Sequence, residues 1–212
     1  MPVLTARGAG VRHRRRWLFR DLDVTVEPGE VVAVVGPPGS GRTTVLLALA
    51  RRFRLTAGRV TLSGPASLGH VPDVSAPEPA FTVADHVRER LALLGHARRE
   101  INTIELYGLR PDARGRDLTP YQKQLLGLVL ARLADPALIA VDGLDDGLNA
   151  AEQAELWSVL TELAAAGTAV LLTAREVDPG RVATVIRVGA EPSTSDVRAG
   201  EGAGLDVREE EQ

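Results

Sequence analysis

A glycine-rich stretch, G-P-P-G-S-G-R-T-T at residues 36–44, constrains this chain more than any other part of the sequence. It follows the β-branched run Glu30–Val35 and precedes a helical pattern over Thr44–Arg52. A strand, a glycine loop and a helix in this order form the phosphate-binding P-loop, G-x-x-x-x-G-K-[ST]. The glycines let backbone N–H groups point at phosphate oxygens, and the helix adds the positive end of its dipole. The sequence therefore predicts a phosphate site.

One position of this loop departs from the motif, because Arg42 stands where lysine is expected. Arginine keeps the charge and can fork onto phosphate oxygens, but it is bulkier than a lysine. The hydroxyl of Thr43 is of the kind that ligates Mg²⁺. We expect the nucleotide phosphates to contact the whole loop: Gly36, Pro37, Pro38, Gly39, Ser40, Gly41, Arg42, Thr43 and Thr44.

Composition narrows the fold class. The 212 residues are 44% hydrophobic but only 3% aromatic, so the core is built from Val, Leu, Ala and Ile. Such a core suits a mostly parallel sheet covered by helices. A net charge of −3 gives no reason to expect nucleic acid, and the lack of cysteine excludes disulfides and thiolate metal sites. No apolar run approaches the roughly 18–20 residues of a membrane span, and no signal peptide is expected.

Patterning along the first part of the chain predicts two regions besides the glycine loop. Short strands at Val3–Ala6, Trp17–Phe19 and Leu22–Val26 indicate an antiparallel flap before the glycine loop. Apolar residues at helical spacing over Thr82–Leu94, after a Thr82 cap, and a second helix around Arg98–Tyr107 indicate a small helical lobe at about residues 80–118.

The second half of the chain adds further core elements. We expect these to be a helix, a strand, a longer helix and two strands, at Tyr121–Leu133, Ala137–Val141, Ala150–Ala166, Thr168–Thr173 and Val182–Val188. Residues 1–190 are then one domain. Residues 191–212 lose periodicity and become acidic, which predicts a disordered tail.

Three segments in this order resemble the nucleotide-binding subunit of ATP-binding-cassette (ABC) transporters over roughly residues 2–190. The stretch Leu18–Glu30 is similar to the family's lead-in to the P-loop. Leu118–Gln124 stands where the family's L-S-G-G-Q signature precedes a helix. Ala137–Asp142, followed by Gly147-Leu148-Asn149, is similar to the Walker B strand and D-loop. The resemblance implies a P-loop NTPase core and Mg-ATP as ligand, with Asp142 holding the metal through water.

The departures from the family pattern fall on hydrolysis. The residues that stand in place of the glutamine, the glutamate and the histidine of the family are Asp73, Gly143 and Ala174. The signature serine becomes Thr119, its two glycines become Pro120 and Tyr121, and the D-loop aspartate becomes Asn149. Losing one positioned catalytic group typically costs about 10²–10⁴-fold. We therefore assign no catalytic residue and expect hydrolysis to be weak or lost.

The resemblance also implies partners and a place in the cell. It implies a membrane permease subunit, a second nucleotide-binding domain in a homo- or heterodimer, and a cytoplasmic, peripheral position at the inner face of the membrane. The family's adenine-stacking aromatic residue falls nearest to His13, which can stack or can simply be exposed in the basic segment Arg12–Arg16. The alternative to a transporter subunit is a non-catalytic P-loop protein that holds a partner or senses nucleotide.

Overall fold

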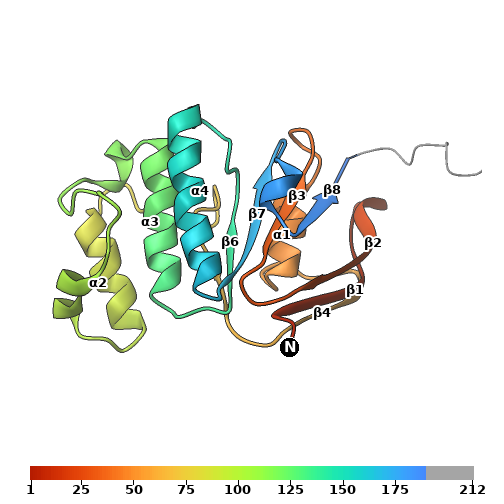
Figure 1. The fold of residues 1–212 in the computed structure, drawn as a ribbon, viewed down its shortest axis with the longest axis horizontal. Coiled ribbons are helices and arrows are strands. Elements are labelled where there is room, and N and C mark those ends of the chain that lie inside the picture. Colours follow the sequence, from red (N-terminus) through yellow and green to blue (C-terminus); the bar gives the residue numbers. More distant parts are fainter. Residues whose placement is uncertain (190–212) are drawn as a thin grey trace, which may run out of the picture.

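The computed structural model describes residues 1–189 and contains two sheets (Figure 1). Its elements, with η for 3₁₀ turns, are β1 (Leu4–His13), β2 (Arg16–Val26), β3 (Val31–Val35), α1 (Arg42–Leu49), β4 (Ala57–Leu62), β5 (Ala66–Leu68), α2 (Val83–Leu93), η1 (Arg98–Thr103), η2 (Gly115–Asp117), α3 (Pro120–Arg132), β6 (Leu138–Val141), α4 (Ala150–Ala165), β7 (Ala169–Ala174), η3 (Pro179–Arg181) and β8 (Thr184–Arg187).

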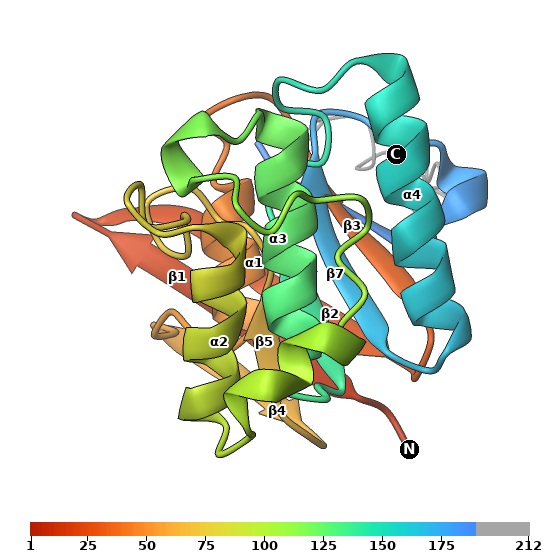
Figure 2. The same ribbon diagram turned by 90° about the vertical axis from the view of Figure 1, so that its left-hand side faces the viewer.

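The larger sheet is parallel, in the order β5-β6-β7-β3-β8. Every residue of β3, β6 and β7 is buried. Such unbroken apolar strands are explained by helices on both faces of the sheet. Helix α1 covers one face, and α3 and α4 lie together on the other (Figures 1 and 2). The predicted P-loop α/β core is confirmed.

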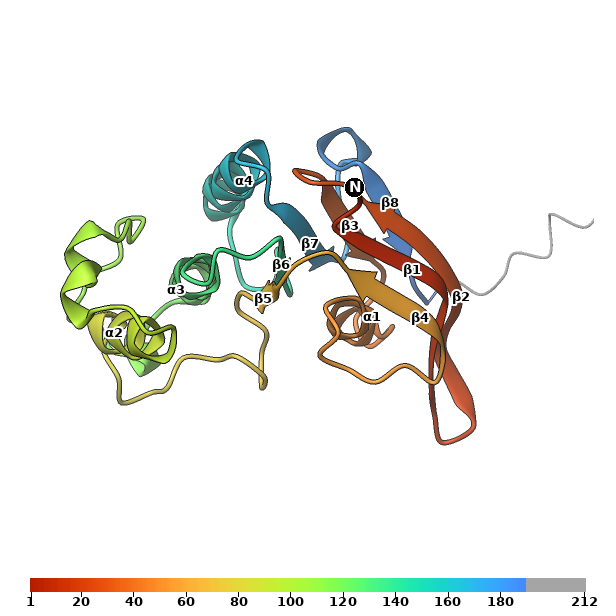
Figure 3. The same ribbon diagram turned by 90° about the horizontal axis from the view of Figure 1, so that it is seen from below.

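The smaller sheet is antiparallel, in the order β2-β1-β4, and confirms the predicted flap. It faces α1 from the side opposite the parallel sheet (Figure 3), and their apolar side chains form one buried cluster. The short strands expected at Val3–Ala6 and Trp17–Phe19 are parts of two long strands, β1 and β2. Gly8 interrupts the apolar pattern, so the sequence does not predict a continuous strand. In the structure the pairing of β1 with β2 shifts at this point, and the Gly8 N–H donates to Asp23 Oδ1 at 2.6 Å.

Helix α2 begins at the predicted Thr82 cap. The Thr82 hydroxyl accepts from the Asp85 N–H at 3.1 Å, and the Asp85 carboxylate accepts from the Thr82 N–H at 3.1 Å. The helix packs on α3 through Val87, Leu91 and Val129. The second helix expected around Arg98–Tyr107 is instead the shorter 3₁₀ turn η1. The turn ends at Thr103 because Ile104 is extended, with φ −85° and ψ 125°.

Two sequence-based expectations concern the ends of this description. The acidic tail predicted for residues 191–212 lies outside the described residues. Within residues 1–189, no helix is both long enough and apolar enough to cross a bilayer.

Candidate functional site

The phosphate loop lies between β3 and α1 at the carboxyl end of the parallel sheet. Gly36 is required by close contact, because a Cβ there would lie 2.3 Å from the Val188 carbonyl oxygen. Gly41 caps α1 with φ +94°, a conformation that side chains disfavour. The loop closes on itself through a hydrogen bond from the Ser40 N–H to the Pro37 carbonyl at 3.2 Å.

Two donors at this loop have no partner in the described residues. Ser40 Oγ and Arg42 Nη1 are both buried and make no hydrogen bond. A buried donor without a partner costs about 1–3 kcal/mol, so such atoms call for an acceptor. Oxygens of a phosphate group are acceptors of the required kind and charge. The loop residues therefore fit a nucleotide phosphate.

Thr43 and Asp142, which are 99 positions apart in the sequence, meet beside this loop. Thr43 Oγ1 donates to Asp142 Oδ2 at 2.8 Å, and Thr173 Oγ1 donates to Asp142 Oδ1 at 2.6 Å. Asp142 is 8% exposed. Within residues 1–189 no group of three His, Cys, Asp or Glu side chains could hold a metal. A magnesium ion would therefore rely on Thr43, Asp142 and phosphate oxygens, all hard oxygen ligands that suit this ion.

Buried polar residues that the sequence analysis did not single out hold the Asp142 segment in place. Gln124, 3% exposed, donates from Nε2 to the Asp142 carbonyl at 2.7 Å. Thr173 Oγ1 accepts from the Gly143 N–H at 2.8 Å. Thr173 stands out in the sequence as a single polar side chain within an apolar run, whereas Gln124 follows the polar residues Gln122 and Lys123 and does not stand out.

His70, two residues after the end of β5, approaches the same segment. Its carbonyl accepts from the Asp142 N–H at 3.2 Å, and its ring Nδ1 is buried without a partner in the described residues. Burial, then the charge of Lys123, lowers the pKa of His70, so the ring is neutral at pH 7. A Cβ at Gly127 of α3 would lie 2.2 Å from the backbone nitrogen of His70, so only glycine lets α3 pack this closely against the His70 backbone.

Gly143 stands where the family has a glutamate, and its backbone disfavours any residue with a side chain. Gly143 has φ +67°, and a Cβ there would lie 2.7 Å from Asp146 Oδ2. The carboxylates of Asp145 and Asp146, close by in the chain, each accept a hydrogen bond from Arg175. Asp145 Oδ2 accepts from its N–H at 3.0 Å, and Asp146 Oδ1 accepts from its guanidinium at 3.0 Å. Ala174, the residue before it, is buried at the end of β7.

The signature-like segment is likewise bonded within the chain. Thr119 caps α3, and its hydroxyl accepts from the Gln122 N–H at 3.2 Å. Pro120 follows at the first helical position. Tyr121 donates its hydroxyl to Glu155 of α4 at 2.8 Å, and burial together with that carboxylate raises the pKa of Tyr121 to about 12. Asn149 caps α4 through the Ala151 and Glu152 N–H groups.

His13 is at the tip of the β1–β2 hairpin, exposed and opposite Arg16. The two turn residues between them, Arg14 and Arg15, have left-handed φ values of 44° and 70°. The part of this hairpin that comes near the loop is Leu18, whose backbone carbonyl would be 3.9 Å from a Cβ on Gly41. Adenine stacking by His13 stays a prediction.

A glycine loop between β3 and α1, with an aspartate at the end of β6, defines the class of P-loop nucleotide-binding proteins. The family model for ABC transporters matches residues 19–144. The chain belongs to the ABC transporter family.

Individual relatives agree with this assignment. The zinc import ATP-binding protein ZnuC of Jannaschia sp. is 30% identical over 186 residues, which are 84% of this chain and 74% of that protein. The hemin import ATP-binding protein HmuV of Gloeobacter violaceus is 36% identical over 137 residues, 63% of this chain. The match spans under half, 47%, of that relative's own length.

Solved structures support the fold. The cbiO1 protein of Clostridium perfringens, part of the ABC transporter complex cbiONQ, superposes with a TM-score of 0.74 at 16% identity, over 88% of this chain and 84% of that one. The ATP-binding cassette MJ0796, solved as a dimer bound to ADP and Pi, superposes with a TM-score of 0.72 at 16% identity, over 87% and 94% of the two chains.

Proposed function

We propose that this chain is the ATP-binding component of a membrane transporter and that it binds Mg-ATP at residues 36–44. The observation that carries the proposal is the pair of buried donors without partners, Ser40 Oγ and Arg42 Nη1, at a loop of P-loop geometry. Arg42 and the loop N–H groups would bind the phosphates, while Thr43 and Asp142 would hold the ion. Bound magnesium would neutralise phosphate charge.

The residues around that site support binding better than turnover. A carboxylate that orients water is not available at Gly143, and Asp145 and Asp146 are both engaged by Arg175. Ala174 has no side-chain group that can accept or donate a proton. We therefore propose that hydrolysis is weak or lost, and we assign no catalytic residue.

Partners and location follow from the family rather than from the geometry of the site. We propose a permease subunit that the lobe at about residues 80–118 contacts, and a second nucleotide-binding domain, identical or not. The protein would then lie peripherally at the cytoplasmic face of the membrane. We propose residues 1–190 as the nucleotide-binding domain.

A second candidate function is a non-catalytic P-loop protein that holds a partner or senses nucleotide. The observation in its favour is that the signature-like segment is bonded within the chain, with Tyr121 on Glu155 and Pro120 at the start of α3. Pro120 has no N–H to donate, and Tyr121 occupies space that glycine would leave open. This reading keeps nucleotide binding but needs no permease.

Titration calorimetry with Mg-ATP, Mg-ADP and adenosine tests the proposal. We expect both nucleotides to bind in the micromolar-to-millimolar range and adenosine to bind far more weakly, because the contacts lie on the phosphates. Near 100 times Kd, the nucleotide should stabilise the fold by about 2.7 kcal/mol. Lack of binding at several millimolar Mg-ATP would reject nucleotide binding. Co-purification with a polytopic membrane protein, in a Mg-ATP-binding chain, would separate the transporter subunit from the second candidate.

A further inference from the structure

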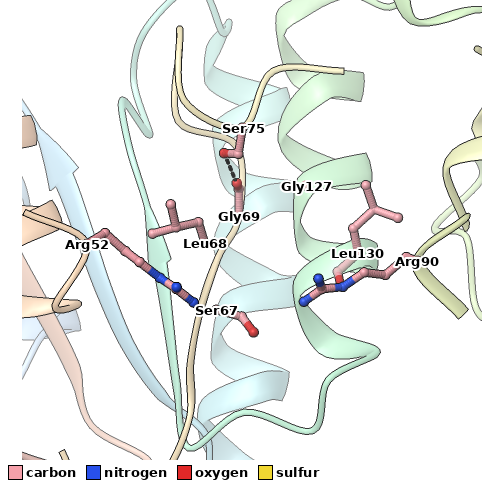
Figure 4. Close-up of a pocket in the computed structure, with 8 residues that line it drawn as sticks. All are labelled: Arg52, Ser67, Leu68, Gly69, Ser75, Arg90, Gly127 and Leu130. Atoms are coloured by element: carbon pink, nitrogen blue, oxygen red, sulfur yellow. Dashed lines mark hydrogen bonds between the residues drawn. The ribbon is translucent and has the colours of Figure 1, made fainter. Parts of the chain in front are cut away.

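A cavity of about 330 Å³ opens between the nucleotide-binding core and the helical lobe. Its lining includes Arg52 and Ser67 from the core, Gly127 from α3 and Arg90 from α2 (Figure 4). No loop residue from 36–44 lines it. The volume is that of a small-molecule site. Leu68 and Leu130 form the apolar part of its wall, and the cavity is separate from the proposed nucleotide site.

Both arginines are anchored by backbone carbonyls. Arg52 Nη2 donates to the Ala66 carbonyl at 2.9 Å, and Arg90 Nε donates to the Leu130 carbonyl at 3.3 Å. Each guanidinium has five N–H donors in a fixed plane, so several remain after one bond. The two side chains extend toward one another from opposite sides of the cavity (Figure 4). Each side chain is therefore held at the cavity by one hydrogen bond, with Arg52 exposed and Arg90 half-buried.

The positive charge in this cavity is not balanced locally. None of the ion pairs formed within residues 1–189 includes Arg52 or Arg90. Arg90 is half-buried, which reduces screening by solvent. Ser67, only 5% exposed, places a hydroxyl in the same cavity. Two cations and a hydroxyl without a local carboxylate form the donor set of an oxyanion site.

We propose that this cavity binds a small phosphate-bearing anion between Arg52 and Arg90. A tetrahedral phosphate presents oxygens in several directions, so it can accept from donors on facing walls at once. A carboxylate presents two oxygens in one plane and can satisfy only one arginine fork well. The bound anion would join the core, through Arg52, to the lobe, through Arg90.

Inorganic phosphate, titrated by calorimetry into the full chain at constant ionic strength, tests the site. Phosphate is also expected at the P-loop, so the titration is made in the Arg42→Ala background. We expect Arg52→Gln and Arg90→Gln each to weaken phosphate binding by about tenfold or more. Arg54→Gln is the matched control, because Arg54 lines a neighbouring groove and not this cavity. It should change the affinity less than about twofold.

Three results would overturn the proposal. One is equal affinity of the three glutamine variants, and another is complete loss of phosphate binding through Arg42→Ala alone. The third is succinate binding as tightly as phosphate, which would assign the cavity to carboxylates. Melting temperatures measured in chloride alone report whether each variant is folded. Arg52→Lys and Arg90→Lys, which keep the charge without the fork, should give affinities between those of the parent and the glutamine variants.

Discussion

The phosphate loop and the segment after Asp142 lie side by side but differ in how their polar groups are used. At the loop, Ser40 Oγ and Arg42 Nη1 are buried without partners in the described residues. After Asp142, the side chains that could serve hydrolysis are bonded to Arg175. The loop thus holds buried donors that call for an acceptor. After Asp142, one oxygen of each carboxylate is bonded to Arg175, and the remaining buried group without a partner in the described residues is an acceptor, Asp145 Oδ1. This difference supports the proposal that the protein binds phosphate but activates water poorly.

The largest expected effect is on turnover. We expect the isolated protein to hydrolyse ATP far below the roughly 1 s⁻¹ of an ordinary enzyme, and Gly143→Glu alone to restore nothing. At φ +67°, with Asp146 in contact, the new side chain would be strained and misplaced. Phosphate release measured with saturating Mg-ATP checks this.

Two variants sharpen that test. Gly143→Ala adds the same backbone strain without a carboxylate. Gly143→Glu combined with Asp146→Gly removes the contact that blocks the side chain. Turnover near 1 s⁻¹ in the parent protein would contradict the comparison and would make Asp73 or the Asp145–Asp146 pair the candidate base.

The next largest effect concerns the Thr173 hydroxyl, which holds Asp142 and the segment after it in place. Thr173→Val removes the donor to Asp142 Oδ1 and the acceptor for the Gly143 N–H, both buried. We expect the free energy of unfolding to fall by about 2–4 kcal/mol, measured by denaturant titration. Thr161→Val is the matched control, because that hydroxyl is exposed and bonds only within its own helix. Equal effects of the two variants would mean that Thr173 does not hold the Asp142 segment.

Arg42 tests the loop directly. Arg42→Ala should weaken binding of Mg-ADP by about 1.5–3 kcal/mol, the usual contribution of a charge-assisted hydrogen bond. Arg42→Lys should retain or improve affinity, since lysine is the usual residue of this motif. Calorimetry with Arg51→Ala as the control gives the comparison, because Arg51 is exposed beyond α1. Unchanged affinity in Arg42→Ala would mean that the backbone alone holds the phosphates.

The smallest expected effect is on the bonded signature segment. Tyr121→Phe should lower the free energy of unfolding by about 0.5–1.5 kcal/mol through loss of the bond to Glu155. The pKa of Tyr121 is raised from 10.0 to about 12 in the fold, so this stability is present below pH 10 and is lost as pH rises through 12. Unfolding curves of both proteins from pH 8 to 12 should converge at the alkaline end. A constant gap would exclude the hydroxyl as the cause.

Sequence reasoning reached the fold because its signals were local. The glycine loop after a β-branched run, the Thr82 cap and the apolar run before Asp142 each depend on adjacent residues, and each has a counterpart in the structure. The sequence predicts only the first part of β1, because Gly8 and Gly10 interrupt the apolar pattern of that strand. The helix expected over Arg98–Tyr107 is too long because the extended backbone of Ile104, which ends the 3₁₀ turn, is marked by no glycine or proline.

The site was less accessible to sequence reasoning because its contacts are distant in the chain. The loop residues, Thr43 and Asp142 could be proposed from motifs. That Thr173 and Gln124 would meet Asp142 depends on strand order and helix packing, which no local pattern encodes. The engagement of Asp145 and Asp146 by Arg175 is of the same kind, because 29 positions separate Arg175 from Asp146.

The left-handed backbone at Gly143 has a consequence for how this chain can change over generations. A single substitution to glutamate introduces strain and a contact with Asp146 before any benefit to turnover. The favourable change, removal of that contact, confers nothing until the glutamate is present. Placing a carboxylate at position 143 therefore requires two substitutions whose separate effects are unfavourable or neutral. With hydrolysis weak or lost, as we propose, the backbone geometry at Gly143 would oppose its return in addition to the missing side chains.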